Sequence, residues 1–280
     1  MKKPLIGAFC ALLLAGVTAL TGAAPATAAK TPTATVAAVD FAGTVALSNC
    51  SGSLVRMPDS LATDPALVLS NGHCLESGMP TAGQVLVNRN SSRSFSLLNS
   101  SGSKVATLRA SKMLYGTMTD TDVSIYQLKT TYSAIKSSYG IDPLTIAATH
   151  PVAGTAIKVV SGYWKRIYSC NADAFVYQLK EGGWTFKDSL RYTSTCNTIG
   201  GTSGSPVVDV TTGQVVAVNN TGNEDGQSCT LNNPCEVDEN GTVTVRQGIN
   251  YAQQTYRIPG CFGPGNVLTL TKAGCALPKP

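Results

Sequence analysis

The sequence predicts an all-β protein, and three observations lead to this class. Only 13% of the 280 residues are charged, which disfavours amphipathic helices with their charged faces. Short runs rich in Val, Leu and Thr recur along the chain and are broken by Gly, Asn and Pro, as strands and turns are. Nine cysteines are present, and those that follow the apolar leader are even in number, which indicates disulfides in an exported chain. The sequence therefore predicts a β-sandwich or a β-barrel.

The start of the chain has the parts of a secretory signal peptide. Two lysines precede an apolar run over residues 5–20, and an Ala-Thr-Ala motif ends at Ala28. We predict that residues 1–28 are removed, that residues 29–40 form a pro-segment or a loose N-terminal arm, and that the protein is secreted and extracellular. A membrane anchor is the alternative, but the apolar run is near the lower limit for a membrane span.

Charge and composition exclude several classes of function. Removal of Lys2 and Lys3 with the leader lowers the formal net charge from +5 to +3, and no dense basic cluster remains, so nucleic acid is not an expected partner. Two histidines and the absence of a close Cys-x-x-Cys pair disfavour a metal site. We expect a monomer with no cofactor and no stable association with membranes after removal of the leader.

The strand-like runs form two groups. The first group covers residues 43–47, 52–56, 66–69, 84–88, 104–108 and 122–128. The second group covers residues 155–163, 174–179, 189–193, 206–210 and 214–219. We expect a solvated hairpin or loop over the Ser-rich residues 91–103, an irregular connection over residues 130–151 and one short helix near residues 251–256.

Ser203 lies in a glycine-rich stretch that suits a nucleophile. The glycines on both sides of it let backbone N–H groups face a small cavity, where they can bind an oxyanion. A serine hydroxyl also needs a base and a group that orients the base. His73 ends an apolar run and precedes Cys74, which makes it the candidate base, whereas His150 precedes a proline and is expected at the surface.

Three stretches together resemble the trypsin-like (chymotrypsin-fold) serine endopeptidases. Cys50–Val55 with Ser70–Cys74, then Asp122–Leu128, then Gly201–Pro206 are similar to the family's elements around its catalytic histidine, aspartate and serine, in the same order. The resemblance implies a secreted endopeptidase that hydrolyses proteins or peptides through an acyl-enzyme intermediate.

The resemblance also implies the fold and its division along the chain. It implies two six-stranded antiparallel β-barrels with the active site in the cleft between them, within a protease domain over residues 41–280. Barrel one would cover about residues 41–135, barrel two about residues 150–260, and a disulfide-stapled C-terminal extension residues 261–280.

Each candidate catalytic residue takes a role from the same resemblance. Ser203 would attack the scissile carbonyl, His73 would take its proton, and Asp122 would orient the imidazole. The N–H groups of Gly201 and Ser203 would form the oxyanion hole. Asp120 is the alternative to Asp122, which we prefer because the alternating strand pattern begins directly after it.

Thr202 marks a departure from trypsin itself, where an aspartate at this place pairs with the new N-terminus after activation. No Ile-Val-Gly-Gly sequence occurs near the expected mature start either. We therefore expect no such salt-bridge switch. The Gly-Gly-Thr-Ser-Gly-Ser-Pro sequence resembles the bacterial secreted glutamyl endopeptidases instead.

The primary substrate pocket is implied by position in the resembling family. Its residues would be Asn197 and Thr198 at the base, and Asn219, Asn220 and Gly222 along the side, where they pair with the substrate backbone. Asn197 lacks the charge that trypsin uses to bind Arg or Lys, and glutamyl endopeptidases have a histidine near the position of Asn219. We therefore expect a small polar pocket.

The cysteines after the leader allow many disulfide connectivities. The resemblance implies Cys50–Cys74, which joins the strand before the histidine to the residue after it. Cys170–Cys196 would link a strand of barrel two to the serine loop. Cys229–Cys235 and Cys261–Cys275 are nearest-neighbour pairs.

Other functions stay open beside the protease. The same fold would also serve as a catalytically silent binding or adhesion module, or as a disulfide-stapled structural protein, although neither role requires an intact triad. An α/β-hydrolase is excluded because its serine precedes its histidine in the chain and begins a helix. Residues 223–239 are expected to be a surface insertion, with a calcium loop as the alternative.

Overall fold

The computed structural model describes residues 38–280 of the chain. The predicted signal peptide over residues 1–28 and most of the predicted pro-segment or arm over residues 29–40 lie outside the described residues. Within the described part of the chain, no helix has both the length and the apolar character needed to cross a membrane.

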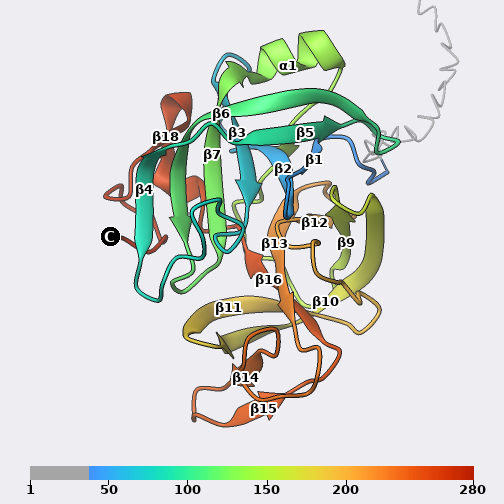
Figure 1. The fold of residues 1–280 in the computed structure, drawn as a ribbon, viewed down its shortest axis with the longest axis vertical. Helices are drawn as coiled ribbons and strands as arrows, with labels where there is room; N and C mark the ends of the chain where they lie inside the picture. Colours follow the sequence, from blue (N-terminus) through green and yellow to red (C-terminus); the bar gives the residue numbers. More distant parts are fainter. Residues whose placement is uncertain (1–37) are drawn as a thin grey trace, which may run out of the picture. The chain divides into compact units, whose positions relative to one another are not determined.

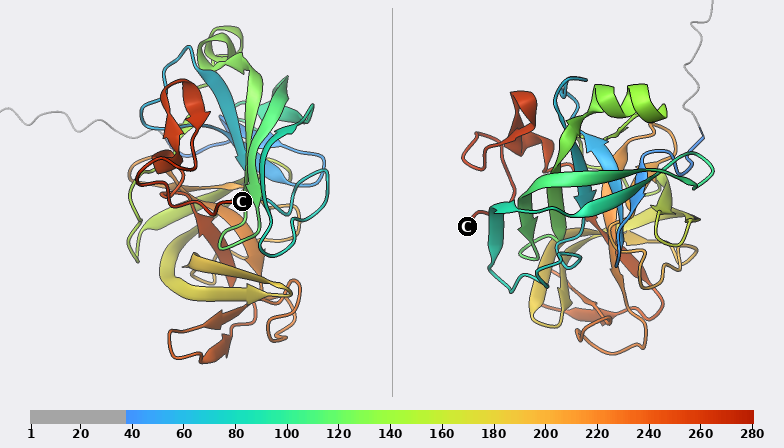
Figure 2. Two further views of the ribbon diagram at one scale, coloured as in Figure 1. Left: turned by 90° about the vertical axis from the view of Figure 1, so that its left-hand side faces the viewer. Right: turned by 45° about the horizontal axis from the view of Figure 1, so that its top comes forward.

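The first barrel occupies the blue-to-green half of the chain in Figures 1 and 2. Its strands are β1 (Thr44–Ala46), β2 (Ser51–Arg56), β3 (Pro65–Ser70), β4 (Val85–Asn90), β5 (Ser94–Leu98), β6 (Lys104–Thr117), β7 (Val123–Thr131) and β8 (Leu144–Thr145). Six of them close into an antiparallel ring in the order β1-β5-β6-β7-β3-β2, because β1 pairs with both β5 and β2. β4 pairs with β6 outside the ring, and β8 pairs in parallel with β2.

The second barrel follows in the yellow-to-orange part of the chain (Figure 1). Its strands are β9 (Ala156–Ser161), β10 (Arg166–Glu181), β11 (Trp184–Tyr192), β12 (Pro206–Asp209), β13 (Val215–Gly222), β14 (Cys235–Val237), β15 (Val243–Val245) and β16 (Asn250–Gln254). The antiparallel ring runs β10-β11-β16-β13-β12-β9 and returns to β10, while β14 and β15 extend from β10. The prediction of two six-stranded antiparallel barrels is confirmed.

The prediction of a solvated hairpin or loop over the Ser-rich residues 91–103 is wrong in its solvation, because the arm of the hairpin is a buried strand. These residues contain β5, which lies between β1 and β6 in the first barrel. Phe95 and Leu97 are fully buried, whereas the serines between and beside them face outward or end the strand. The high serine content predicted a loop, but the apolar residues at alternate positions form a strand.

The helix predictions are also wrong at two places. Residues 130–151 contain α1 (Tyr132–Tyr139), which Thr131 caps by accepting a hydrogen bond from the Ala134 N–H and which ends at Gly140 in the left-handed conformation. Residues 251–256, expected to be helical, begin as part of β16, because pairing with β11 and β13 overrides their local preference.

Four apolar clusters occur in the described structure, and three of them hold the barrels and join them. One cluster draws on the strands of the first barrel and another on those of the second. The third contains Tyr115 from the first barrel, Val160 from the second, and Ile258 and Leu277 from the C-terminal end. Full burial of such side chains contributes about 1.5–3 kcal/mol each, so the third cluster fixes the barrels against each other.

The C-terminal extension packs against the first barrel. It contains η1 (Pro259–Cys261), β17 (Phe262–Gly263), η2 (Pro264–Asn266) and β18 (Val267–Leu268). Asn266 is 2% exposed, accepts a hydrogen bond from Ser60 Oγ at 2.6 Å, and donates to the Pro65 carbonyl at 2.8 Å. Tyr115 donates to the Pro278 carbonyl at 2.9 Å. Through these contacts the extension holds the end of the second barrel to the first.

The described cysteines form four disulfides. The pairs are Cys50–Cys74, Cys170–Cys196, Cys229–Cys235 and Cys261–Cys275, the same pairs that the sequence analysis proposed. Four disulfides are consistent with an extracellular protein, because such bonds persist in oxidising surroundings.

Candidate active site

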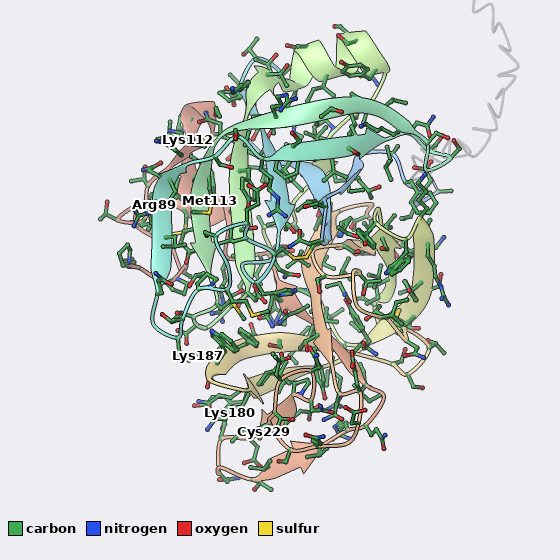
Figure 3. The ribbon with its side chains drawn as sticks, viewed as in Figure 1. Arg89, Lys112, Met113, Lys180, Lys187 and Cys229 are labelled. Atoms are coloured by element: carbon green, nitrogen blue, oxygen red, sulfur yellow. A yellow bond between two sulfur atoms is a disulfide. The ribbon has the colours of Figure 1, made fainter. Side chains whose placement is uncertain are left out.

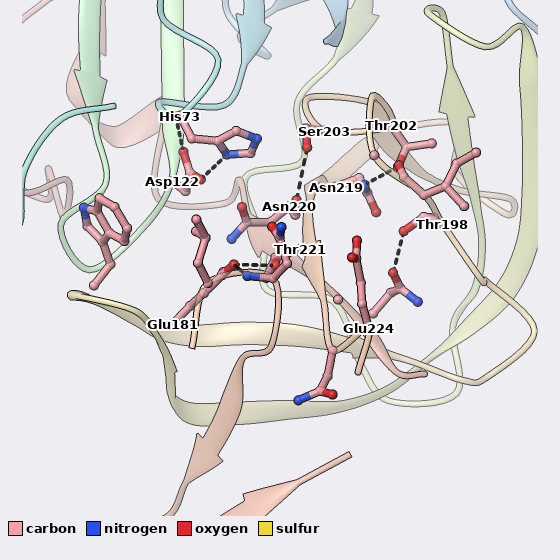
Figure 4. A pocket seen from close by; sticks show the side chains of 18 of the residues that line it. His73, Asp122, Glu181, Thr198, Thr202, Ser203, Asn219, Asn220, Thr221 and Glu224 are labelled. Carbon is pink, nitrogen blue, oxygen red and sulfur yellow. Dashed lines mark hydrogen bonds and ion pairs between the residues drawn. The ribbon is translucent and has the colours of Figure 1, made fainter. Parts of the chain in front are cut away.

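A cavity of about 580 Å³ lies where the two barrels meet. The first barrel contributes His73 and Asp122 to its wall, and the second contributes Ser203 (Figure 4). The three residues that the sequence analysis proposed as a triad therefore lie in one site.

His73 and Asp122 form a tightly fixed pair. Nδ1 of His73 lies 2.6 Å from Oδ2 of Asp122, and the His73 backbone N–H donates to Oδ1 at 3.0 Å. The Asp122 side chain is 1% exposed, and that of His73 is 19% exposed. With Nδ1 engaged, Nε2 is the nitrogen that can exchange a proton with the nucleophile. Cys50 and Cys74 beside the imidazole are bonded to each other, so they offer no thiolate to a metal.

The turn that carries His73 depends on the two residues before it. A side chain at Gly72 would meet a neighbouring backbone carbonyl oxygen at 2.1 Å, so only glycine fits. Asn71 Nδ2 donates to the Asp122 carbonyl at 2.7 Å, and Ser124 Oγ donates to the Asn71 carbonyl at 2.7 Å. These bonds join the end of β3 to the start of β7 and hold the imidazole against the carboxylate.

The pKa of His73 is raised above its ordinary value. Burial is the largest single influence and lowers this pKa, but the charge and hydrogen bond of Asp122, helped by the charge of Glu181, outweigh burial. The site therefore stabilises the imidazolium that forms when His73 takes a proton, as a general base requires.

The two alternatives to this pair lie elsewhere. Asp120 forms an ion pair with Lys187 at 2.9 Å, so Asp122 is the aspartate beside the cavity histidine. His150 does not line the cavity; its Nε2 lies 3.3 Å from Asp188 Oδ1, and its side chain is 37% exposed.

Hydrogen bonds to both barrels hold the loop that carries Ser203. The Ser51 N–H donates to the Ser203 carbonyl at 2.8 Å, and the Gly204 N–H donates to the Asn219 carbonyl at 2.9 Å. Gly204 has a left-handed φ of 82°, and a side chain there would meet the Ser51 carbonyl oxygen at 2.1 Å. Glycine at this position lets the loop approach the first barrel closely.

The Ser203 hydroxyl donates to the Asn220 carbonyl at 3.3 Å, and no hydrogen bond joins it to His73 among the described residues (Figure 4). Rotation about the serine Cα–Cβ bond redirects Oγ between staggered positions. Hydrogen bonds between nucleophile and base often tighten only when substrate binds, so this arrangement is compatible with catalysis.

Two backbone N–H groups at the Ser203 loop, predicted as oxyanion donors, have no protein acceptor in the described structure. Within residues 38–280, neither the Gly201 N–H nor the Ser203 N–H donates to another protein group. Trp164 Nε1 donates to the Gly200 carbonyl at 2.7 Å, which directs the Gly201 N–H of the same trans peptide away from Trp164. Ser203 and Gly200 line the cavity, whereas Gly201 does not contribute to its wall.

Thr202 is 1% exposed and is hydrogen-bonded within the loop. Its hydroxyl donates to the Ile199 carbonyl, and Asn219 Nδ2 donates to Thr202 Oγ1 at 3.2 Å. The loop thus keeps its shape through neutral local hydrogen bonds, at the position where trypsin uses a charged aspartate.

The residues predicted for the substrate pocket all line the same cavity; they are Asn197, Thr198, Asn219, Asn220 and Gly222. Thr198 is buried and donates to Asn250 Oδ1 at 2.8 Å, whereas Asn197 is exposed. The Asn219 side chain accepts a hydrogen bond from Tyr192 at 3.1 Å. None of the five residues carries a charge, but the carboxylate of Glu224, which also lines the cavity, lies near Thr198 (Figure 4).

Asn250 and Glu181 are among the cavity residues that sequence reasoning missed. Asn250 begins β16, and Glu181 ends β10. Glu181 is 6% exposed; burial, the largest influence, raises its pKa. Its only sequence context is a Lys-Glu-Gly-Gly turn, which is typical of an exposed hairpin and gives no sign of a site.

A family comparison agrees with this geometry. Residues 50–218 match the trypsin-like peptidase domain. The chain belongs to this family. Membership supports a peptidase of the serine type that acts on peptide substrates, and the matched residues include His73, Asp122 and Ser203. The narrower resemblance to glutamyl endopeptidases stays a prediction. No curated protein matches the sequence.

Several solved structures are similar to this chain. The MamO protease domain of Magnetospirillum magneticum is 13% identical, covers 76% of this chain and 92% of its own, and gives a TM-score of 0.46. The Nocardiopsis protease NAPase is 14% identical, with coverages of 77% and 93% and a TM-score of 0.43. Cellulomonas bogoriensis chymotrypsin is 12% identical, with coverages of 77% and 92% and a TM-score of 0.42.

Proposed function

We propose that this protein is a secreted serine endopeptidase with Ser203 as nucleophile, His73 as general base and Asp122 as the group that orients the base. The observation that carries the proposal is the 2.6 Å contact between His73 Nδ1 and Asp122 Oδ2, in the cavity that also contains Ser203. A buried carboxylate on Nδ1 leaves Nε2 free to accept a proton from the serine.

The reaction follows from these roles. Ser203 Oγ attacks the scissile carbonyl carbon while His73 Nε2 takes the hydroxyl proton, and Asp122 stabilises the imidazolium. The N–H groups of Gly201 and Ser203 bind the oxyanion, and one such donor is worth about 3–4 kcal/mol in comparable enzymes. The imidazolium then protonates the leaving amine, which leaves an acyl group on Ser203. Water then attacks the acyl carbon while His73 Nε2 takes a proton from it. The imidazolium returns this proton to Ser203 Oγ as the bond between Oγ and the acyl carbon breaks, and the acid is released.

The substrate side chain before the scissile bond would enter the compartment formed by Thr198 and Asn250. The hydrogen bond between these residues makes the compartment polar, and neither residue carries a charge. We propose that it accepts a small polar side chain. Profiling of a peptide library tests this point, and a strong preference for Arg, Lys or large aromatic residues immediately before the cleaved bond would contradict it.

Labelling with a fluorophosphonate probe, beside casein hydrolysis, tests the proposed function. The mature wild-type protein is expected to be labelled and to cleave casein, and Ser203→Ala is expected to lose both properties while it keeps the wild-type circular dichroism spectrum. Folded wild-type protein that neither labels nor cleaves would contradict the proposal.

One observation favours a second candidate, a catalytically silent binding module. The Ser203 hydroxyl donates to the Asn220 carbonyl instead of His73. If this bond is permanent, Ser203 cannot be activated, and the cavity would bind peptides without cleaving them. The same labelling experiment separates the two candidates.

A further inference from the structure

Glu181 is a buried carboxylate in the cavity, and no ion pair joins it to another side chain among residues 38–280. Its side chain accepts hydrogen bonds through Oε1, from Thr221 Oγ1 at 3.0 Å and from the Asn232 N–H at 2.9 Å. Oε2 has no hydrogen-bond partner among residues 38–280 and is not fully shielded from solvent. A buried carboxylate is unfavourable without a counter-charge, and this one keeps an oxygen available for it.

No lysine or arginine side chain supplies that charge in the described structure, and His73 interacts with Glu181 without a hydrogen bond or ion pair between them. The cavity wall contains the acids Asp122, Glu181 and Glu224 but neither lysine nor arginine. Two lysines share the β10–β11 hairpin with Glu181 (Figure 3). Lys180 is exposed, and Lys187 pairs with Asp120. The cavity is therefore negative, and its buried acid is free to pair with a cation from a ligand.

Apolar side chains stand beside the carboxylate. Trp184 lies directly opposite Glu181 across the hairpin, so both side chains project from the same face. Trp184 is held by a hydrogen bond from Nε1 to the Pro80 carbonyl at 2.9 Å. Leu231, next to the residue that donates to Oε1, also lines the cavity. A carboxylate flanked by an indole and an aliphatic side chain suits a cation on an apolar stem.

The carboxylate lies on the opposite side of the serine from the Thr198 compartment (Figure 4). It bonds to Thr221, the residue after Asn220, whose carbonyl accepts the Ser203 hydroxyl. Successive side chains of an extended substrate point to opposite faces. A substrate that lies along β13 with one side chain in the Thr198 compartment therefore presents the preceding side chain to Glu181.

We propose that Glu181 selects a lysine or arginine at the second residue before the scissile bond, here called the penultimate residue. The alkyl stem would pack against Trp184, and the cationic head would pair with the open carboxylate oxygen. This inference rests on the proposed endopeptidase function and names the class of peptide that the same site prefers. It differs from trypsin-like recognition, where the cation lies immediately before the cleaved bond.

The test compares acetylated peptides that differ only at the penultimate residue. Lysine, norleucine and ε-acetyllysine share an alkyl stem, and lysine alone carries a charge. We expect the wild-type kcat/KM for the lysine peptide to exceed that for the norleucine and ε-acetyllysine peptides at least about tenfold, which corresponds to about 1.4 kcal/mol. Acetylation removes the α-amine as an alternative cation. A preference seen only with unblocked peptides would assign the carboxylate to the substrate N-terminus and overturn the proposal.

Glu181→Gln keeps the side-chain oxygen that accepts the two hydrogen bonds and removes the charge. We expect its ratio of kcat/KM for the lysine peptide to that for the norleucine peptide to fall to about one. Glu239→Gln, which removes an equal charge from an exposed residue outside the cavity, is the control and should keep the wild-type ratio. Glu224→Gln at the exposed rim should lower the ratio only slightly.

Three further results would overturn the inference. They are a wild-type ratio near one, an unchanged ratio in Glu181→Gln, and an equal loss in Glu224→Gln, which would assign the preference to the general negative potential. If Glu181→Gln does not fold, the wild-type ranking of lysine against ε-acetyllysine still decides. Fluorophosphonate labelling of the wild type distinguishes failure of this inference from failure of the proposed function. Absence of labelling would contradict the protease proposal itself. Labelling without a preference for lysine would contradict only this inference.

Discussion

Two histidine–aspartate pairs occur in the described structure, and they differ in every property that matters for proton transfer. In the cavity, both oxygens of Asp122 bond to His73, through Nδ1 at 2.6 Å and through the backbone N–H at 3.0 Å. On the surface, Asp188 lies 3.3 Å from His150 Nε2 and also accepts a hydrogen bond from Tyr256 at 2.9 Å. The Asp122 carboxylate therefore binds only His73 among the described residues, whereas the Asp188 carboxylate binds several residues.

The imidazole nitrogens differ in the same way. His73 has one nitrogen engaged, and its Nε2 is available within the cavity. Both nitrogens of His150 are occupied, Nδ1 by the Pro151 carbonyl and Nε2 by Asp188 and Gln254. Its ring also packs against Phe175, with centroids 4.3 Å apart. Proximity of an aspartate is therefore not enough, because a catalytic histidine also needs a free nitrogen beside a nucleophile.

The largest expected effect separates the two histidines. His73→Gln should lower kcat for peptide hydrolysis about 10⁶-fold, as loss of the base does in a comparable triad, because glutamine cannot take the serine proton. His150→Gln should stay within about twofold of wild type, since a surface substitution leaves the proton path intact. Steady-state kinetics on one peptide measures both. Similar losses in the two variants would break the distinction drawn here.

The two aspartates should differ by a smaller factor. Asp122→Asn is expected to lower kcat about 10⁴-fold, because an amide favours the wrong tautomer of the imidazole. Asp188→Asn, the matched change in the surface pair, should leave kcat near that of wild type. Asp120→Asn should do the same, and a large loss there would reverse the assignment of the orienting aspartate.

The pH dependence should sharpen the comparison further. His73 is a base only when neutral, so kcat/KM should rise with pH as this residue loses its proton. Since its pKa is raised above the ordinary value of 6.5, the midpoint of this rise should lie above 6.5. His150→Gln should not move the midpoint. A midpoint below 6.5 on a neutral peptide would contradict the electrostatic account of the site.

The smallest expected effect is on stability. Asp188 lies at 25% exposure and contacts Tyr256 and Arg257 as well as His150. Loss of its charge in Asp188→Asn should lower the free energy of unfolding by about 0.5–1 kcal/mol, as expected for a partly exposed ion pair. Urea denaturation measures this change. A loss of several kcal/mol would show that the surface pair is a main element of the fold.

Much of the fold could be predicted from the sequence, because short apolar runs broken by turn residues indicate β-strands. The family motifs then predicted the two barrels. The missed strands β5 and β16 share one cause, because tertiary pairing decided what local composition could not. The serines of β5 led to the prediction of a loop, although the buried residues Phe95 and Leu97 alternate with them as in a strand. The helix α1 did carry readable signals, a capping Thr131 before it and Gly140 after it.

Some residues of the candidate site could also be predicted from the sequence, and others could not. His73, Asp122 and Ser203 could be predicted because each is embedded in a family motif. Glu181 and Asn250 could not, because no motif surrounds them and only the packing of the second barrel brings them to the cavity. The residues proposed to determine specificity lie on a hairpin and at a strand end, whose positions depend on the whole barrel, whereas the proposed reacting groups lie in recognisable sequence motifs.

The most direct measurement is the rate of covalent labelling at Ser203 by a fluorophosphonate, with the modified peptide identified by mass spectrometry. The account predicts that wild type and His150→Gln react at the same rate, that the label lies on Ser203, and that His73→Gln is labelled at least about 10³-fold more slowly, because the serine then lacks its base. Equal labelling rates in wild type and His73→Gln, or a label on another residue, would contradict it.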